Sequence, residues 1–143
     1  MKSNRFYLII MFLFSINSNA TTVLASSFGY NTTNATNALQ NAIDSNNDTI
    51  IVDLQSSDWN VGPLNFFSLN NKTIILEKGV KIRAIFGLYS ASTSLNTCLF
   101  RFVNCSNIIF IGYEAEFIMN KPEYIALNNS EDRHCMSFLI VAL

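Results

Sequence analysis

Apolar and polar residues alternate along this chain in short blocks, a pattern that predicts several brief strands and one helix. Between Ala35 and Ile43 the apolar positions follow the spacing i, i+3, i+4, i+7 and i+8, which predicts an amphipathic helix with Thr33 or Asn34 as its N-cap. We expect this helix to end in the polar cluster that follows Asp44. Blocks rich in β-branched and apolar residues predict strands over residues 49–54, 99–103 and 108–117 and from residue 136 onward.

Two strand-turn-strand stretches repeat one another without a gap at an offset of 35 residues. Residues 71–82 align with residues 106–117, so that Ile74 matches Ile109 and Ile82 matches Phe117. Repetition at such a period is typical of solenoids, whose units bury their apolar faces against one another. The uneven spacing of the strands favours a β-solenoid over a sandwich, in which turns recur every ~8–12 residues. Because the chain ends within an apolar block, we expect an N-terminal piece of a longer fold.

The N-terminus contains the three parts of a secretory signal peptide. Lys2 and Arg5 precede an apolar run over residues 6–16, and Ser18 and Ala20 provide the small residues of a cleavage site. The run is shorter than the ~20 apolar residues that span a bilayer. We therefore predict a signal peptide over residues 1–20, a mature domain over residues 21–143, secretion, and no membrane contact after cleavage.

Composition narrows the range of partners. The chain has nine basic and ten acidic residues, a formal net charge of −1, and removal of Lys2 and Arg5 would lower it to −3. No basic patch remains that would attract nucleic acid. Half of the residues are hydrophobic and 13% are charged, which predicts a packed core rather than disorder.

Sequons and cysteines are the candidate sites of covalent chemistry. In a eukaryotic secreted protein, Asn-x-Ser/Thr sequons mark positions open to glycan attachment. The sequons of the mature chain begin at Asn31, Asn34, Asn47, Asn71, Asn104 and Asn128. The three cysteines allow two interpretations: Cys98 and Cys105 form a disulfide and leave Cys135 unpaired, or all three are core thiols. No Cys/His spacing indicates a zinc site.

Several stretches together resemble the opening of pectin-lyase-like right-handed parallel β-helix proteins, the superfamily of pectate lyases and polygalacturonases. The similar stretches are residues 27–30, 34–44, 49–52, 61–64, 71–80 and 105–113. They correspond to the lead-in, the capping helix and the first coils of that superfamily. Three departures stand out: Ser27 replaces the lead-in aspartate, Asn34 and Asn37 replace an acidic pair, and Glu114 replaces the second glycine of a turn. A glutamate where the turn needs positive φ would be strained.

The resemblance implies an all-β fold: a right-handed parallel β-helix (solenoid) with a short N-terminal capping helix, incomplete at its C-terminus. It also implies a polysaccharide as substrate or ligand. Hydrolases of the superfamily use paired aspartates with Gly-His-Gly and Arg-x-Lys motifs, and lyases use calcium-bound carboxylates with a base. None of these motifs occurs here. We therefore predict no catalytic, cofactor-binding or metal-binding residue in this chain. Ca²⁺ would be a cofactor if the full-length protein were a lyase, but this sequence gives no support for a calcium site.

A few polar residues remain as weak candidates for a ligand site. The cluster Glu131, Asp132, Arg133 and His134 either lines a carbohydrate groove or forms a solvated loop. Trp59, in a polar loop predicted over residues 55–60, either stacks on a sugar ring or caps a coil of the core. Asp53 and Asp58 bracket a loop near it. Glu114 and Glu116 would share a strand face as a weak cation site.

Three functions are compatible with these observations. The chain is the leading part of a secreted polysaccharide-acting enzyme whose catalytic residues lie beyond Leu143, or a non-catalytic extracellular carbohydrate-binding or adhesive protein, or an inactive truncated product. Acidic residues clustered on one sheet face in downstream coils would favour the first function, and aromatic ladders without carboxylates would favour the second. An uncovered last unit would favour self-association through its exposed strand edges.

Overall fold

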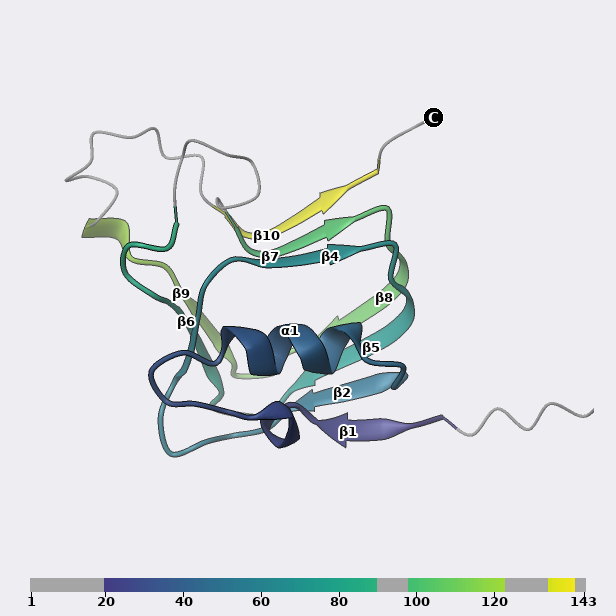
Figure 1. Ribbon diagram of the computed structural model, residues 1–143, viewed down its shortest axis with the longest axis horizontal. Coiled ribbons are helices and arrows are strands. Elements are labelled where there is room, and N and C mark those ends of the chain that lie inside the picture. Colours follow the sequence, from purple (N-terminus) through teal and green to yellow (C-terminus); the bar gives the residue numbers. More distant parts are fainter. Residues whose placement is uncertain (1–19, 90–97, 123–133, 141–143) are drawn as a thin grey trace, which may run out of the picture.

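The computed structural model describes residues 20–89, 98–122 and 134–140, which form three parallel sheets together with an α-helix, a 3-10 helix and a helical segment at residues 121–122 (Figure 1). Sheet A consists, in spatial order, of β1 (Thr22–Leu24), β2 (Thr49–Val52), β5 (Asn70–Leu76) and β8 (Ser106–Ile111). Sheet B consists of β3 (Trp59–Val61), β6 (Lys81–Ala84) and β9 (Glu116–Ile118). Sheet C consists of β4 (Leu64–Phe67), β7 (Cys98–Val103) and β10 (His134–Leu139). The helices are η1 (Ala25–Phe28) and α1 (Thr36–Asp44).

The expected fold class, an all-β right-handed parallel β-helix, needs correction. The described residues form three short parallel sheets of four, three and three strands together with α1, and no solenoid is assigned to them. Residues in the left-handed region between strands, such as Ser68 (φ 56°) and Asn104 (φ 53°), turn the chain out of each sheet after a few residues. Apolar blocks are therefore divided among different sheets: the strand predicted over residues 108–117 is split between β8 and β9.

The register of β5 and β8 differs by one residue from the gapless sequence alignment. Ile74 lies opposite Phe110 rather than Ile109, whereas β6 and β9 keep the expected register, with Ile82 opposite Phe117. Between paired positions, five residues (76–80) therefore follow Ile75 before Lys81, whereas four (112–115) follow its partner Ile111 before Glu116. Because successive side chains of a strand point to opposite faces, the shift places Ile109, which is 54% exposed, on the outer face.

Helix α1 confirms the helix predicted from the apolar spacing, but the predicted N-cap is wrong: Ala35, which has no side-chain cap, takes that position instead of Thr33 or Asn34. Its buried residues Ala38, Leu39, Ala42 and Ile43 lie on one face. At the N-terminus, Asn34 Oδ1 accepts hydrogen bonds from Thr36 N (3.0 Å) and Thr36 Oγ1 (2.6 Å). At the C-terminus Ser45 is extended (φ −63°, ψ 167°), which ends the helix.

Polar groups of α1 and of its N-terminal flank form hydrogen bonds with the edge strands of sheets B and C. Gln40 Nε2 donates to the Asn65 carbonyl of β4 (2.9 Å), and the Asn65 N–H donates back to Gln40 Oε1 (3.1 Å). Thr36 Oγ1 accepts from the Gly62 N–H (2.7 Å), and the Ala35 N–H donates to the Asn60 carbonyl of β3 (2.7 Å). Backbone groups at the edges of β3 and β4 are thereby satisfied without a further strand.

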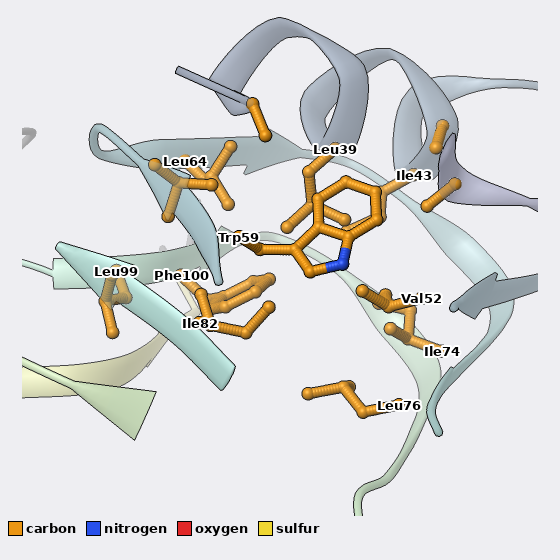
Figure 2. Packing of buried hydrophobic residues seen from close by; sticks show 14 of the residues in the cluster. Leu39, Ile43, Val52, Trp59, Leu64, Ile74, Leu76, Ile82, Leu99 and Phe100 are labelled. Atoms are coloured by element: carbon orange, nitrogen blue, oxygen red, sulfur yellow. The ribbon is translucent and has the colours of Figure 1, made fainter. Parts of the chain in front are cut away.

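The core lies between the three sheets and under α1. Figure 2 shows Trp59 with the α1 residues Leu39 and Ile43 on one side and the sheet A residues Val52 and Ile74 on the other. Trp59 was expected in a polar loop, but it opens β3 and is only 1% exposed. Its indole N–H donates to the Asp53 carbonyl (3.0 Å), and its ring meets Tyr30 edge-on at 4.7 Å.

Candidate functional site

Asp53 and Asp58, the carboxylates that bracket the loop before Trp59, are both held by structural contacts. Asp53 Oδ1 accepts from the Ser26 N–H (3.0 Å), and its Oδ2 accepts from Gln55 Nε2. Asp58 Oδ2 accepts a hydrogen bond from Arg83 Nε (2.7 Å) and forms an ion pair with Arg83 Nη2 (2.7 Å). These two carboxylates therefore fix a lead-in segment and a neighbouring strand.

Trp59 is not available to a sugar ring. Its ring is buried among core residues and its only polar atom is already paired with Asp53. The prediction that Trp59 covers the core is confirmed, and the prediction that it stacks on a sugar ring is wrong.

Glu114 and Glu116 do not share a strand face, because Glu114 lies in a turn and Glu116 lies in a strand. Glu114 occupies the turn before β9 with φ 55°, and its carboxylate forms an ion pair with Lys78 (2.7 Å). Glu116 belongs to β9 and pairs with Lys81 (3.4 Å). In the part of the chain that the structure describes, no group of three or more His, Cys, Asp or Glu side chains could hold a metal ion.

The remaining described carboxylates are also occupied. Asp44 accepts from Gln40 Nε2 (2.7 Å), Asp48 from the Thr21 N–H (3.0 Å), and Glu77 from the Leu54 N–H (2.7 Å). Every aspartate and glutamate among residues 20–89, 98–122 and 134–140 thus has a hydrogen-bond or ion-pair partner.

The expected polar cluster around His134 falls mostly outside the described residues. Glu131, Asp132 and Arg133 lie outside them. His134 is the exposed first residue of β10, opposite Cys98 of β7.

Lys72 is a buried cation whose role the sequence reasoning missed. It lies on the inward side of β5 in line with Ile74, and only 7% of it is exposed. Its Nζ donates to the Ser45 carbonyl and, at 2.5 Å, to the Asn47 carbonyl, just after the end of α1. Burial lowers the pKa of Lys72 below its ordinary value of 10.5, although Asp48 and Asp44 oppose the shift. The sequence signal that could have revealed this buried cation is a lysine at an inward-facing position of a strand.

The outer face of sheet A is uncharged and carries two rows of side chains across its four strands. One row consists of Thr22, Thr49, Thr73 and Ile109. The other consists of Leu24, Ile51, Ile75 and Ile111. Each row is only partly covered, and Leu24, Ile109 and Ile111 are exposed. By contrast, the outer face of sheet B carries the ion pairs of Arg83 and Lys81.

The sequons differ in how free their amide nitrogen is. Asn31 and Asn34 are exposed, and each accepts hydrogen bonds through Oδ1 from the threonine two residues on. Asn71 Oδ1 accepts from Asn107 Nδ2 (2.9 Å). Asn47 Nδ2, the atom that would carry a glycan, donates to Ser45 Oγ (2.9 Å). Asn104 is exposed, and Asn128 lies outside the described residues.

The three cysteines are free thiols, as one of the two interpretations of the sequence expected. Cys98 is buried, and Cys105 Sγ lies 3.5 Å from the Val103 carbonyl. Burial raises the pKa of the Cys135 thiol, and the neighbouring Cys98 raises it further. The loop-closing disulfide between Cys98 and Cys105 is therefore not formed in this structure.

The predicted signal peptide over residues 1–20 lies outside the described residues except for Ala20. Among the described helices, none has the length and apolar character needed to cross a membrane. A scan against protein-family models and searches of curated proteins and of solved structures found no match to this chain. The pectin-lyase-like resemblance thus gains no support from them.

Proposed function

We propose that this chain is a secreted, non-catalytic binding protein whose sheet A outer face binds a neutral polysaccharide. The observation that carries the proposal is the occupation of every described aspartate and glutamate by a structural partner, as detailed above for Asp53, Asp58 and Glu116. Acid–base cleavage of a glycosidic bond needs carboxyl groups that are free to exchange protons. Binding without cleavage needs no such carboxyl group.

The chemistry of the sheet A face supports a neutral sugar polymer as the ligand. Its threonine row offers hydroxyl groups, and its leucine and isoleucine row offers apolar surface. A pyranose ring has the same division, with hydroxyl groups at its edge and C–H groups on its faces. Neighbouring strands lie about 4.8 Å apart, a spacing comparable to one sugar unit of an extended chain.

Electrostatics argue against an acidic ligand. The chain carries a net charge of −1, and the cations on the outer face of sheet B, Lys81 and Arg83, are paired with carboxylates. Neither nucleic acid nor a polyuronate would find a surplus of positive charge on the described surface.

Depletion of the protein from solution by insoluble neutral polysaccharides tests the proposal. We expect binding by the unaltered chain and at least about tenfold weaker binding by Ile75→Lys, since a charge in the middle of the face must be desolvated. Phe67→Lys, which places the same charge on the outer face of sheet C, is the matched control and should bind normally. Preference for acidic polymers, or equal loss in both variants, would contradict the proposal.

Catalysis is tested on the same samples. Prolonged incubation with neutral and acidic polysaccharides should release neither reducing ends nor unsaturated uronates. Product formation that is proportional to protein and survives purification would show that the chain is an enzyme.

Secretion can be tested independently by expressing all 143 residues in a eukaryotic secretory host. We expect mass spectrometry to find the mature N-terminus after Ala20 and glycans at Asn31 or Asn34. Asn47 should remain unmodified because a glycan there would break the hydrogen bond to Ser45. Retention of residues 1–20, or full occupancy of Asn47, would contradict this part of the proposal.

A further inference from the structure

Thr21, the residue that follows the predicted cleavage site, is tied through its backbone to the residues that begin β2. Its N–H donates to Asp48 Oδ2 (3.0 Å), and its carbonyl accepts from the N–H groups of Asp48 (3.1 Å) and Thr49 (3.0 Å). The next residue, Thr22, opens β1 and lies opposite Thr49 of β2 (Figure 1). The Asp48 carboxylate therefore binds the first backbone nitrogen of the predicted mature chain.

The position of the cut decides whether this contact is kept. Ala20 and Thr21 are exposed, and removal of residues 1–20 leaves β1 paired with β2. Ala25 is the other small residue that could precede a cut, but it is fully buried, and the Ser26 N–H after it is bound by Asp53 (3.0 Å). A cut after Ala25 would remove β1 altogether, whereas a cut after Ala20 places a new amino group at Asp48.

The charges around this contact come from side chains near the end of α1. Neither β2 nor η1, against which β1 packs, contains an ionisable side chain. Lys72 of β5 donates to the Asn47 carbonyl and is a second cation that acts on Asp48, and Asp44 is a carboxylate that acts on Lys72 in turn. A positive charge on the Thr21 nitrogen would therefore be attracted by Asp48 and opposed by Lys72.

We propose that hydrolysis of the Ala20–Thr21 peptide bond converts this hydrogen bond into an ion pair, with Asp48 as the binding site for the α-ammonium group of Thr21. In this step a signal peptidase adds the hydroxyl group of a water molecule to the Ala20 carbonyl carbon, and the bond to the Thr21 nitrogen breaks. The nitrogen takes up the other hydrogen of water and the proton that the new Ala20 carboxyl group releases. The inference rests on the secretory processing proposed above and not on the polysaccharide ligand.

An ion pair at this place makes the stability of the mature chain depend on pH. The ordinary pKa of an α-amino group is about 7.7–8.0. The Asp48 carboxylate, 3.0 Å from the nitrogen, favours the ammonium form and raises this pKa in the folded chain, while Lys72 and solvent limit the effect. The stabilisation is therefore fully present below about pH 7.7 and is lost as the pH rises through the raised value.

The rate at which acetic anhydride labels the α-amine of the folded, secreted chain tests the ion pair, because only the neutral amine reacts. At about pH 7 the N-terminal peptide should be labelled at least about twofold more slowly than in Asp48→Asn, which keeps an oxygen acceptor but lacks the charge. At about pH 10.5, where both amines are neutral, the two rates should converge. Mass spectrometry of the N-terminal peptide measures the labelled fraction and identifies the first residue.

Glu77→Gln is the matched control for this measurement. Glu77 also accepts one backbone N–H, that of Leu54 (2.7 Å), but it follows β5, whereas Asp48 precedes β2. Because these strands are parallel, the two carboxylates lie at opposite ends of sheet A. The α-amine of Glu77→Gln should be labelled at the same rate as that of the unaltered chain.

A second comparison changes the N-terminus and leaves Asp48 unaltered. Chains that begin at Thr21 or at Ala20 are released from a fusion by a protease that leaves no extra residue, and the α-amine at Ala20 should be labelled faster at about pH 7. A secreted chain that begins elsewhere than Thr21 would contradict the proposed processing and this inference together. A chain that begins at Thr21 but is labelled as fast as Asp48→Asn, or as fast as the chain that begins at Ala20, would overturn this inference alone. Equal acceleration in Glu77→Gln and Asp48→Asn would overturn it as well.

Discussion

At one end of the three sheets the strand edges are short or hydrogen-bonded to α1 and its lead-in, whereas at the other end β8, β9 and β10 have no further strand among the described residues. The closed end is rich in side-chain-to-backbone hydrogen bonds, made by Thr36, Gln40 and Lys72. The open end is rich in exposed apolar side chains, such as Phe138 and Ile140. The difference shows that a sheet edge can be closed by side chains instead of strands, provided that each backbone group finds a partner.

The largest expected effect comes from truncating the two ends of the phenylalanine stack. Phe66→Ala should lower the free energy of unfolding by about 3–5 kcal/mol, because it leaves a cavity in a fully buried site. Phe138→Ala should cost no more than about 1.5 kcal/mol at protein concentrations where the chain is monomeric, since most of its ring is already in water. Urea unfolding followed by Trp59 fluorescence measures both. Equal losses would mean that the end of the stack at Phe138 is as well covered as the end at Phe66.

Removing the amide of Gln40 should have the next largest effect. Gln40→Met keeps the length of the side chain but leaves the N–H and carbonyl of Asn65 without their α1 partner, which costs about 1–3 kcal/mol. Asn41→Met, on the exposed side of the same helix, is the control and should change stability by less than about 0.5 kcal/mol. If the two variants unfold at the same urea concentration, water replaces Gln40 at this edge and the closed end is not closed by side chains.

Glu114 offers a smaller and opposite effect near the open end. Gly79 occupies the corresponding turn one strand level earlier with φ 82°, and Glu114 has φ 55° without the freedom of glycine. Glu114→Gly should therefore raise the free energy of unfolding by about 1 kcal/mol or less, even though it removes an exposed ion pair with Lys78. Glu114→Gln removes only the charge and should be nearly neutral. A destabilised glycine variant would show that the ion pair outweighs the backbone strain.

Local patterns predicted the helix and most strands because their signals are carried by neighbouring residues. Ala38, Leu39, Ala42 and Ile43 share a face at helical spacing, and α1 is found there. Trp59 was misplaced because β3 has only three residues, too few for alternation to identify a strand. The register of β8 was misplaced because the deletion of one turn residue leaves the apolar pattern of both strands intact while exchanging their faces.

The spacing of residues along the sequence could not predict which partners the candidate site residues contact. The contacts that occupy Asp53 and Asp58 come from Ser26 and Arg83, which are distant in the chain and adjacent only once the sheets have formed. The uncharged outer face of sheet A likewise appears only when the register is known, because Ile109 in the aligned register would have faced the core. A strained turn at Glu114 could be foreseen, since the substitution stood where the compared turn has glycine.

The smallest predicted effect concerns the buried cation at the closed end. Because burial lowers the pKa of Lys72 in the folded chain, the unfolded chain binds more protons between that lowered value and 10.5. The contribution of this group to the free energy of unfolding therefore rises as the pH increases through that window. In Lys72→Met the rise should be absent, although the variant is less stable at every pH because the Ser45 and Asn47 carbonyls lose their donor. Lys78→Met, at an exposed lysine, should keep the pH dependence of the unaltered chain. The measurement is the urea midpoint of the unaltered chain and of both variants at a series of alkaline pH values. Titrations that all three proteins share cancel when the midpoints are subtracted from one another. If the difference between the unaltered chain and Lys72→Met stays flat toward pH 10.5, the ammonium is hydrated, and the end of α1 is open to water.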